Sequence, residues 1–330
     1  MSQISLLSPD PIALVRSTLA AVTCPGDASL ISGVHMHRLE LLAADTGDEV
    51  GPSILHISEA LDGGLAGVEE LESPEVGRLL FRHKGAPDAG SIFVPAGTLV
   101  RGGGQNRIVS LSTLLMPGEV RNVEVRCVEK GRWTVHRDRE FTGTGSSPLS
   151  LKSHKLSRDS TARLREARSR ASDQGETWND VDRHLESRTV TSHTSSLFDA
   201  IDQRAHMVVE LPERLAGAAG AWMEGETTGG EVFVSAGLRR AGMRSLAESA
   251  VSDGGGDGAD GGSAGCARPT VSFGEVQADV SASPDWKATE VPGGTIVDFR
   301  GARSGVVGSA FVAATAGGQG RVIHVAMAVV

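Results

Sequence analysis

The stretch Val120-Arg-Asn-Val-Glu-Val-Arg-Cys-Val128 decides the expected fold class of this 330-residue chain. Apolar and polar residues alternate along it, so that Val123, Val125 and Cys127 fall on one face of an extended chain. The opposite face carries polar and charged side chains. This alternation predicts a half-buried antiparallel strand, with one face in the core and the other toward solvent.

Similar strands are expected on both sides of that stretch, in the most regular part of the chain, between residues 91 and 135. Glycine- and proline-containing turns separate them. The expected strands are Ile92–Val94, Thr98–Val100, Arg107–Leu115 and Arg132–Val135. Consecutive strands joined by short turns favour an antiparallel sheet over a doubly wound parallel one.

The rest of the chain predicts helices between two further groups of strands. Helices are expected at 11–22, at two places within 158–188 and at 241–251, and strands within 34–50 and at 220–226, 231–236, 295–300, 307–313 and 322–330. This order predicts an α+β fold, mostly antiparallel β and sandwich- or barrel-like, with an inserted helical segment.

Four segments describe the expected domain organisation. Residues 1–54 would supply an N-terminal helix and strand, and residues 55–250 a β-rich domain with helices at about 158–188. Residues 251–268 are rich in Gly and Asp and are expected to form a flexible loop. Residues 269–330 would add C-terminal strands that complete the same domain.

Composition and charge narrow the classes of function. The chain has 32 Lys and Arg against 41 Asp and Glu, a net charge of -9, which argues against a nucleic-acid partner. No apolar stretch is long enough to cross a bilayer, and the first residues lack a secretory pattern. We therefore expect a soluble cytoplasmic protein without a membrane partner.

Cysteines and histidines give no metal or disulfide signature. The three cysteines are widely spaced, and no Cys-x-x-Cys pair occurs. His35 and His37 lie on one face of a predicted strand, but no third ligand is evident. No metal site is predicted, and the sequence does not identify a cofactor.

A glycine-rich loop, Gly102-Gly-Gly-Gln-Asn-Arg107, lies between two expected strands. Backbone N–H groups at Gly103 and Gly104 would approach an anion closely, and Arg107 would clamp a phosphate or carboxylate. Gln105 would read an amide or hydroxyl group. The alternative is an ordinary hairpin turn whose arginine faces solvent.

The densest group of reactive side chains is Cys127-Val-Glu-Lys-Gly-Arg-Trp133. Cys127 near basic residues would be a candidate nucleophile, but the alternation places it on the apolar face, where a free cysteine is a small core residue. Glu129, Arg132 and Trp133 suit the rim of a polar pocket, with Trp133 available for stacking. Trp133 would equally serve as a core anchor.

Three sequence elements resemble a known family. Residues 94–109 are similar to its Gly-x-x-Gln-x-Arg element, residues 123–133 to its Val-x-Cys-Val-Glu-x-Gly-Arg-Trp element, and residues 174–178 to its Gln-x-x-x-Trp helix. The family is the ADP-ribosylglycohydrolase- and rhodanese-phosphatase-superfamily-associated protein domain. The resemblance implies a role near NAD-derived nucleotides or ADP-ribosylation, with protein partners in ADP-ribose metabolism. It carries over no catalytic set.

Two main hypotheses follow. In the first, the domain binds or processes ADP-ribose or a related NAD-derived nucleotide: the glycine loop and Arg107 hold the pyrophosphate, Trp133 stacks, and Glu129 polarises a ribose hydroxyl or a water. In the second, it is a non-enzymatic interaction or structural module in which Arg132 pairs with glutamates and no pocket forms. A third hypothesis, a hydrolase that uses Cys127 with a histidine such as His136, ranks last.

Overall fold

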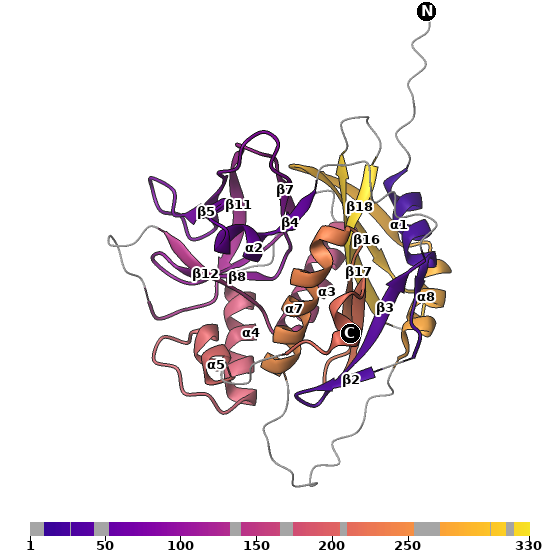
Figure 1. Cartoon of the computed structure of the whole chain (residues 1–330). Helices are drawn as coiled ribbons and strands as arrows, with labels where there is room; N and C mark the ends of the chain where they lie inside the picture. The colour runs from indigo at the N-terminus through magenta and orange to yellow at the C-terminus, as the bar shows by residue number, and fades with distance from the viewer. Residues whose placement is uncertain are drawn as a thin grey trace, which may run out of the picture.

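Antiparallel sheets make up most of the structure. The computed structural model describes residues 10–26, 28–42, 53–132, 140–165, 174–204, 210–253, 271–303, 305–314 and 320–330. Within these residues, strands form three sheets, and helices pack between and around them (Figure 1). The prediction of an α+β, mostly antiparallel and barrel-like fold is confirmed.

The six-stranded sheet is nearly closed, and we call it the barrel-like sheet. Its strands, in spatial order, are β12 (Phe141–Ser146), β8 (Thr98–Gly102), β9 (Arg107–Val109), β11 (Val120–Cys127), β6 (Arg78–His83) and β5 (Ala66–Glu69). A bridge between Glu69 and Glu140 brings the two edges together. The apolar face of β11 predicted from its alternation is buried inside, since Val123, Val125 and Cys127 are at most 4% exposed.

A three-stranded sheet lies beside it. It consists of β10 (Thr113–Leu115), β7 (Ser91–Val94) and β4 (Ile54–His56), with α2 (Ile57–Asp62) following β4. The prediction of one strand over 107–115 is wrong, because β9 and β10 belong to different sheets. Ser110 donates its backbone N–H to the Glu124 carbonyl at 2.9 Å, and the Ser112 hydroxyl accepts from the Ala96 N–H at 3.0 Å. These bonds hold the chain where it crosses from one sheet to the other.

The largest sheet draws strands from both ends of the chain, and we call it the large sheet. Its strands are β1 (Val22–Thr23), β2 (Ala28–Ile31), β3 (Val34–Leu41), β13 (Gly220–Glu224), β14 (Gly229–Phe233), β15 (Trp286–Val291), β16 (Gly294–Arg300), β17 (Val306–Ala314) and β18 (Gly320–Val329). The spatial order is β1-β3-β13-β14-β18-β17-β16-β15, with β2 also paired to β3. The strands expected at 220–226 and 231–236 are present and pair as the hairpin β13–β14, the three expected C-terminal strands are present, and β15 joins them.

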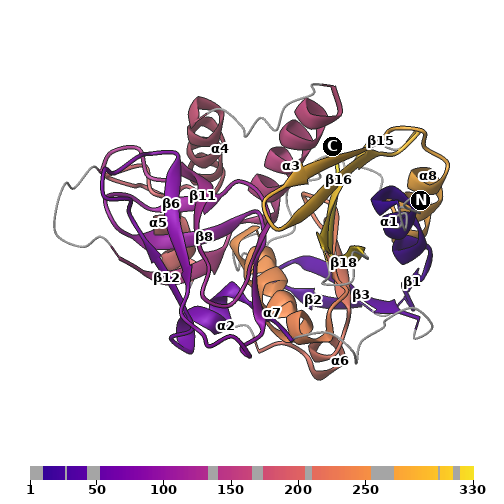
Figure 2. The same ribbon diagram turned by 90° about the horizontal axis from the view of Figure 1, so that it is seen from above.

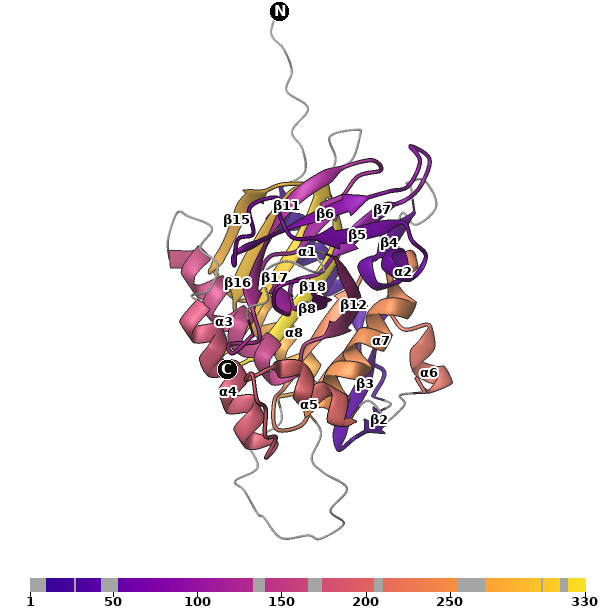
Figure 3. The same cartoon turned by 90° about the vertical axis from the view of Figure 1, so that its left-hand side faces the viewer.

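Helices cover both faces of the large sheet. α1 (Pro11–Ala20) and α8 (Phe273–Ser281) pack on one face, whereas α3 (Leu149–Arg165) and α7 (Ala236–Asp253) lie between the other face and the barrel-like sheet (Figure 2). The short helices α5 (Leu197–Arg204) and α6 (Glu213–Ala216) and the longer α4 (Gln174–Ser187) flank this arrangement (Figure 3). α3 and α7 thus form the middle layer.

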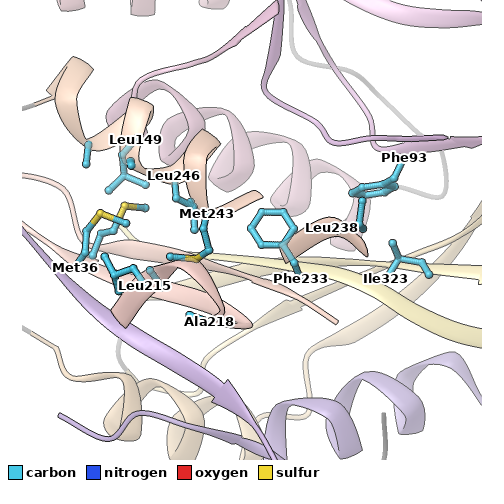
Figure 4. Close-up of a cluster of buried hydrophobic side chains, with 14 of the residues drawn as sticks. Met36, Phe93, Leu149, Leu215, Ala218, Phe233, Leu238, Met243, Leu246 and Ile323 are labelled. Carbon is cyan, nitrogen blue, oxygen red and sulfur yellow. The ribbon is translucent and has the colours of Figure 1, made fainter. Parts of the chain in front are cut away.

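The apolar side chains of α7 hold the middle layer to both neighbours. Leu238, Met243 and Leu246 meet Phe233 of the large sheet and Phe93 of the three-stranded sheet in one buried cluster (Figure 4). The Phe93 ring also lies 5.5 Å from the ring of Phe311, centroid to centroid. Burial of several large apolar side chains, each contributing roughly 1.5–3 kcal/mol, fixes the position of α3 and α7 between the sheets.

Several expected segments end elsewhere or fall outside the described residues. α3 begins at Leu149 rather than near 158, and α7 at Ala236 rather than 241. The expected strand 132–135, apart from Arg132, and the Gly/Asp-rich loop, apart from the last turn of α7, lie outside the described residues. No helix among the described residues is long and apolar enough to span a membrane.

Candidate functional site

Two of the three family-like sequence elements, those at 94–109 and 123–133, lie side by side where β9 and β11 pair in the barrel-like sheet. β9 pairs with β11, and Arg107 stands opposite Cys127 in this register. The glycine loop that precedes β9 therefore reaches the turn that follows β11. We call the side chains and loop residues gathered here the motif cluster: Gly103, Gly104, Gln105, Arg107, Cys127, Glu129 and Arg132.

Arg107 lies at the centre of the motif cluster and is fully buried. Its Nη1 donates to the Gln105 Oε1 at 3.3 Å, and its Nη2 lies 3.6 Å from an oxygen of the buried Glu70. Burial lowers the pKa of Arg107 from its ordinary value, although nearby Cys127 and Glu70 oppose that shift. The guanidinium therefore faces protein groups rather than solvent.

Glu129 is held by donors on both carboxylate oxygens. Its Oε2 accepts from the Asn106 N–H at 3.2 Å and from the Arg132 Nε at 2.9 Å, and its Oε1 accepts from the Thr194 hydroxyl at 3.0 Å. Burial alone would raise the pKa of Glu129, but the bonds from Arg132 and Asn106 outweigh it and hold the pKa below its ordinary value. Glu129 is thus a fully bonded carboxylate.

Cys127 is a core residue by its surroundings. It is fully buried, and its thiol donates to the backbone carbonyl of Glu129 at 2.9 Å. Burial raises the pKa of the Cys127 thiol, so the thiolate that a nucleophile needs is disfavoured. The Gln174 side chain of α4 pairs with both backbone groups of Cys127, at 2.9 and 2.8 Å. This amide pairing accounts for the glutamine of the Gln-x-x-x-Trp element.

Packing requires a glycine at position 103. Its φ of +52° lies in the left-handed region, and a Cβ there would come within 2.6 Å of the Phe141 ring. The neighbouring Gly104 donates its N–H to Glu70 at 3.2 Å. The loop amide at Gly104 therefore already has an acceptor within the protein. Two further sequence candidates, Trp133 and His136, lie outside the described residues.

The remaining sequence candidates do not form a metal site. His37 Nε2 lies 3.3 Å from the Glu224 carboxylate, whereas His35 is exposed. Among the described residues, no group of three or more His, Cys, Asp or Glu side chains is arranged to hold a metal ion.

A separate cavity lies where α3, the large sheet and the break between β9 and β10 meet. It measures about 70 Å³, several times the space that one water molecule needs. Leu149, Leu156 and Phe311 supply apolar wall, as is usual for ligand sites. We call it the central cavity. Its charged or titratable lining residues are Lys152, Lys155, Asp159, Arg163, Glu231 and His324.

Buried ion pairs neutralise much of the charge in the central cavity. Lys152 Nζ lies 2.9 Å from the Glu231 carboxylate, which the His324 Nε2 also approaches at 2.7 Å. Burial alone would raise the pKa of Glu231, but the charge of Lys152 and the bond to His324 lower it well below its ordinary value. Nearby, Lys155 Nζ binds the Asp159 carboxylate and donates to the Ser110 carbonyl at 3.2 Å.

Four polar side-chain atoms around this cavity have no hydrogen-bond partner among the described residues. They are Ser110 Oγ, Ser153 Oγ, Asp159 Oδ1 and Arg163 Nη1, and each residue is at most 4% exposed. Buried polar atoms are almost always bonded, so four around one cavity mark a place for polar atoms that the described residues do not supply. Together they offer two hydroxyls, a carboxylate acceptor and a guanidinium donor.

Comparison with known proteins gives one result. A family model described as the ARG and Rhodanese-Phosphatase-superfamily-associated Protein domain, ARPP-1, matches residues 28–328. The chain belongs to the ARPP-1 family. No curated protein and no solved structure matches it significantly. The ARPP-1 name records an association with ADP-ribosylglycohydrolases and so a broad ADP-ribose context.

The ARPP-1 sequence held one overlooked signal for the central cavity. The whole chain has only five lysines, and two of them, Lys152 and Lys155, stand three residues apart at the start of α3. Charged residues at helical spacing are usually solvated, and both lysines precede the 158–188 segment in which helices were expected. Three charged residues of α3, Lys155, Asp159 and Arg163, are buried.

Proposed function

We propose that this protein binds a small hydroxyl-rich ligand in the central cavity, and that the ligand is the ribosyl part of ADP-ribose or a related NAD-derived nucleotide. The observation that carries the proposal is the set of four buried polar atoms around one cavity that find no hydrogen-bond partner in the described part of the chain. A sugar hydroxyl both donates and accepts, so ribose hydroxyls match serine, carboxylate and guanidinium groups together.

The size and surroundings of the cavity also support a ribosyl ligand. Apolar wall beside a few polar groups suits a sugar ring, with one face against carbon and its hydroxyls bonded. A second hollow, of about 430 Å³, shares Ser153 with the central cavity and is lined by the adjoining Thr227 and Thr228. It offers room for the larger remainder of a nucleotide. The ARPP-1 association with ADP-ribosylglycohydrolases favours this class of ligand and makes enzymes of ADP-ribose metabolism the candidate protein partners.

Calorimetric titration of the full chain with ADP-ribose, ribose 5-phosphate and AMP tests the proposal. Ser153→Ala removes one unpartnered hydroxyl, and we expect affinity to fall roughly fivefold to tenfold, the cost of about one hydrogen bond. Ser73→Ala, at an exposed serine, is the matched control and should leave affinity unchanged. Absence of binding by all three compounds, or equal loss in both variants, would overturn the proposal.

For the motif cluster we propose a second role, that of a structural brace. The observation that favours it is that the Glu129 carboxylate accepts hydrogen bonds from Asn106, Arg132 and Thr194. These bonds connect the glycine loop to the turn after β11. Arg107→Met should then lower thermal stability while the folded variant keeps its ligand affinity. If the folded variant loses ADP-ribose binding instead, Arg107 belongs to a ligand site and the brace is insufficient.

A further inference from the structure

Lys155 has the setting of an amine that reacts while neutral. It is buried on α3, and its Nζ binds Asp159 and the Ser110 carbonyl. Burial lowers the pKa of Lys155, the Asp159 charge opposes the shift, and the positive charges of Arg163 and Arg126 add to it. Desolvation and neighbouring cations are the two devices by which proteins make a lysine nucleophilic.

Asp159 is placed to move protons for such an amine. One carboxylate oxygen, Oδ2, binds Lys155 Nζ, whereas Oδ1 has no hydrogen-bond partner among the described residues. A carboxylate with one oxygen on the amine and the other unoccupied reaches both the nitrogen and an oxygen of a bound ligand. The apolar wall beside it limits competing water.

We propose that Lys155 forms an imine with the aldehyde carbon of a ring-opened ribosyl ligand in the central cavity, an inference that rests on the proposed function. The lone pair of the neutral Nζ bonds to the aldehyde carbon, and the C=O π electrons move to oxygen. Asp159 carries one N–H proton to that oxygen to give a carbinolamine. It then carries the second N–H proton to the hydroxyl, which leaves as water as the C=N bond closes. No oxidant or reductant is consumed.

This chemistry separates ligands by their anomeric carbon. ADP-ribose and ribose 5-phosphate carry a free anomeric hydroxyl and open to an aldehyde. In AMP the same carbon is held by the N-glycosidic bond to adenine, so AMP fills a ribosyl site without reacting. AMP is therefore the matched control ligand.

The chain also supplies control lysines. Lys152 lies on the same helix, with its Nζ 2.9 Å from the Glu231 carboxylate, and Lys84 and Lys130 are exposed. Because the chain has only five lysines, the site of every adduct can be assigned. Unspecific reaction with a sugar aldehyde would follow exposure and favour Lys84 and Lys130.

The test is reductive trapping. The full chain is incubated with ADP-ribose and cyanoborohydride, digested and mapped by mass spectrometry with fragmentation. We expect a mass increase on Lys155 equal to the ligand less one oxygen atom, at least about tenfold above Lys84 and Lys130, because binding raises the effective aldehyde concentration. AMP alone should give no adduct, and excess AMP should protect Lys155. Lys155→Arg should abolish the adduct while its melting profile reports folding.

The outcomes distinguish the two proposals. Calorimetric binding of ADP-ribose with adducts only on exposed lysines overturns the imine and leaves the binding function standing. If excess AMP does not lower the yield of the Lys155 adduct, the imine proposal is also overturned. That measurement needs only the wild-type chain. Absence of calorimetric binding by all three compounds overturns the binding function itself.

Discussion

Arg163 of α3 binds Asp298 of β16 through two hydrogen bonds, 2.6 and 2.7 Å long, and both side chains are buried. The pair anchors the helix that lines the central cavity to the large sheet. The third guanidinium nitrogen of Arg163, Nη1, is one of the four cavity atoms that have no hydrogen-bond partner within the described ranges. One guanidinium therefore both anchors the helix and faces the proposed ligand site.

Asp298→Asn should be strongly destabilising. The change leaves the buried charge of Arg163 without its counter-ion, and breaking one side of a buried pair costs about 3–5 kcal/mol. Asp202→Asn breaks the exposed pair with Arg101, whose atoms lie 2.6 Å apart, and should cost less than about 1 kcal/mol. Urea unfolding of the three proteins measures both changes. Equal losses of unfolding free energy in the two variants would show that the buried charge of Arg163 does not need Asp298 as its counter-ion.

Glu129→Gln should weaken the brace in a pH-dependent way. The pKa of Glu129 is depressed in the folded state, so its contribution is present above about pH 4.5, the ordinary value, and is lost as the pH falls through the folded pKa. Near neutral pH we expect a loss of about 1–3 kcal/mol in the free energy of unfolding, shrinking in acid. Glu72→Gln, at an exposed glutamate, should show no such difference. A loss that stays constant down to pH 3 would contradict the charge-based brace.

His56 should make the fold sensitive to mild acid. Burial, followed by the charge of Lys152, lowers the pKa of His56 to about 4 from an ordinary 6.5. Between these values the unfolded chain binds a proton that the folded chain does not, so stability falls as the pH falls from 6.5 to 4, by on the order of 3 kcal/mol. His56→Asn should flatten the plot of unfolding free energy against pH over this interval. His35→Asn, at an exposed histidine, is the control, and the same flattening there would refute the assignment.

Cys127 should resist alkylation in the native state. Its thiol is fully buried, bonded to the Glu129 carbonyl and raised in pKa by burial, whereas Cys24 is partly exposed. Iodoacetamide followed by peptide mapping should label Cys24 well before Cys127, and denaturant should remove the difference. Rapid native labelling of Cys127 would revive the cysteine hydrolase hypothesis.

Local alternation predicted three of the six strands of the barrel-like sheet, β8, β9 and β11, but β5, β6 and β12 were not expected from the sequence. The apolar face of β11 is read directly from residues 120–127, and the turns around it fix its neighbours. Pairing of the two motif elements then follows, since β9 and β11 are neighbours. The break at Ser110 escaped prediction because Arg107–Leu115 reads as one β-rich run, and only hydrogen bonds to distant backbone and side-chain groups divide it.

The central cavity escaped prediction for a different physical reason. The inner face of α3 carries Lys155, Asp159 and Arg163, which a hydrophobic pattern assigns to solvent. Their burial depends on partners distant in the sequence, namely Asp298 and the Ser110 carbonyl. Because its first turns are also polar, α3 was expected to begin near residue 158, nine residues after its actual start at Leu149.

The pairing order of the large sheet constrains how the chain is made. β3 pairs with β13, which lies about 180 residues further along the sequence, and β14 pairs with β18, the last strand described. On a ribosome, β14 must emerge with the backbone N–H and C=O groups of one edge unpaired until the final strand is synthesised. Premature termination before residue 320 would leave that edge free to capture a neighbouring chain. Production of this protein should therefore depend on chaperones that shield β-strands during translation.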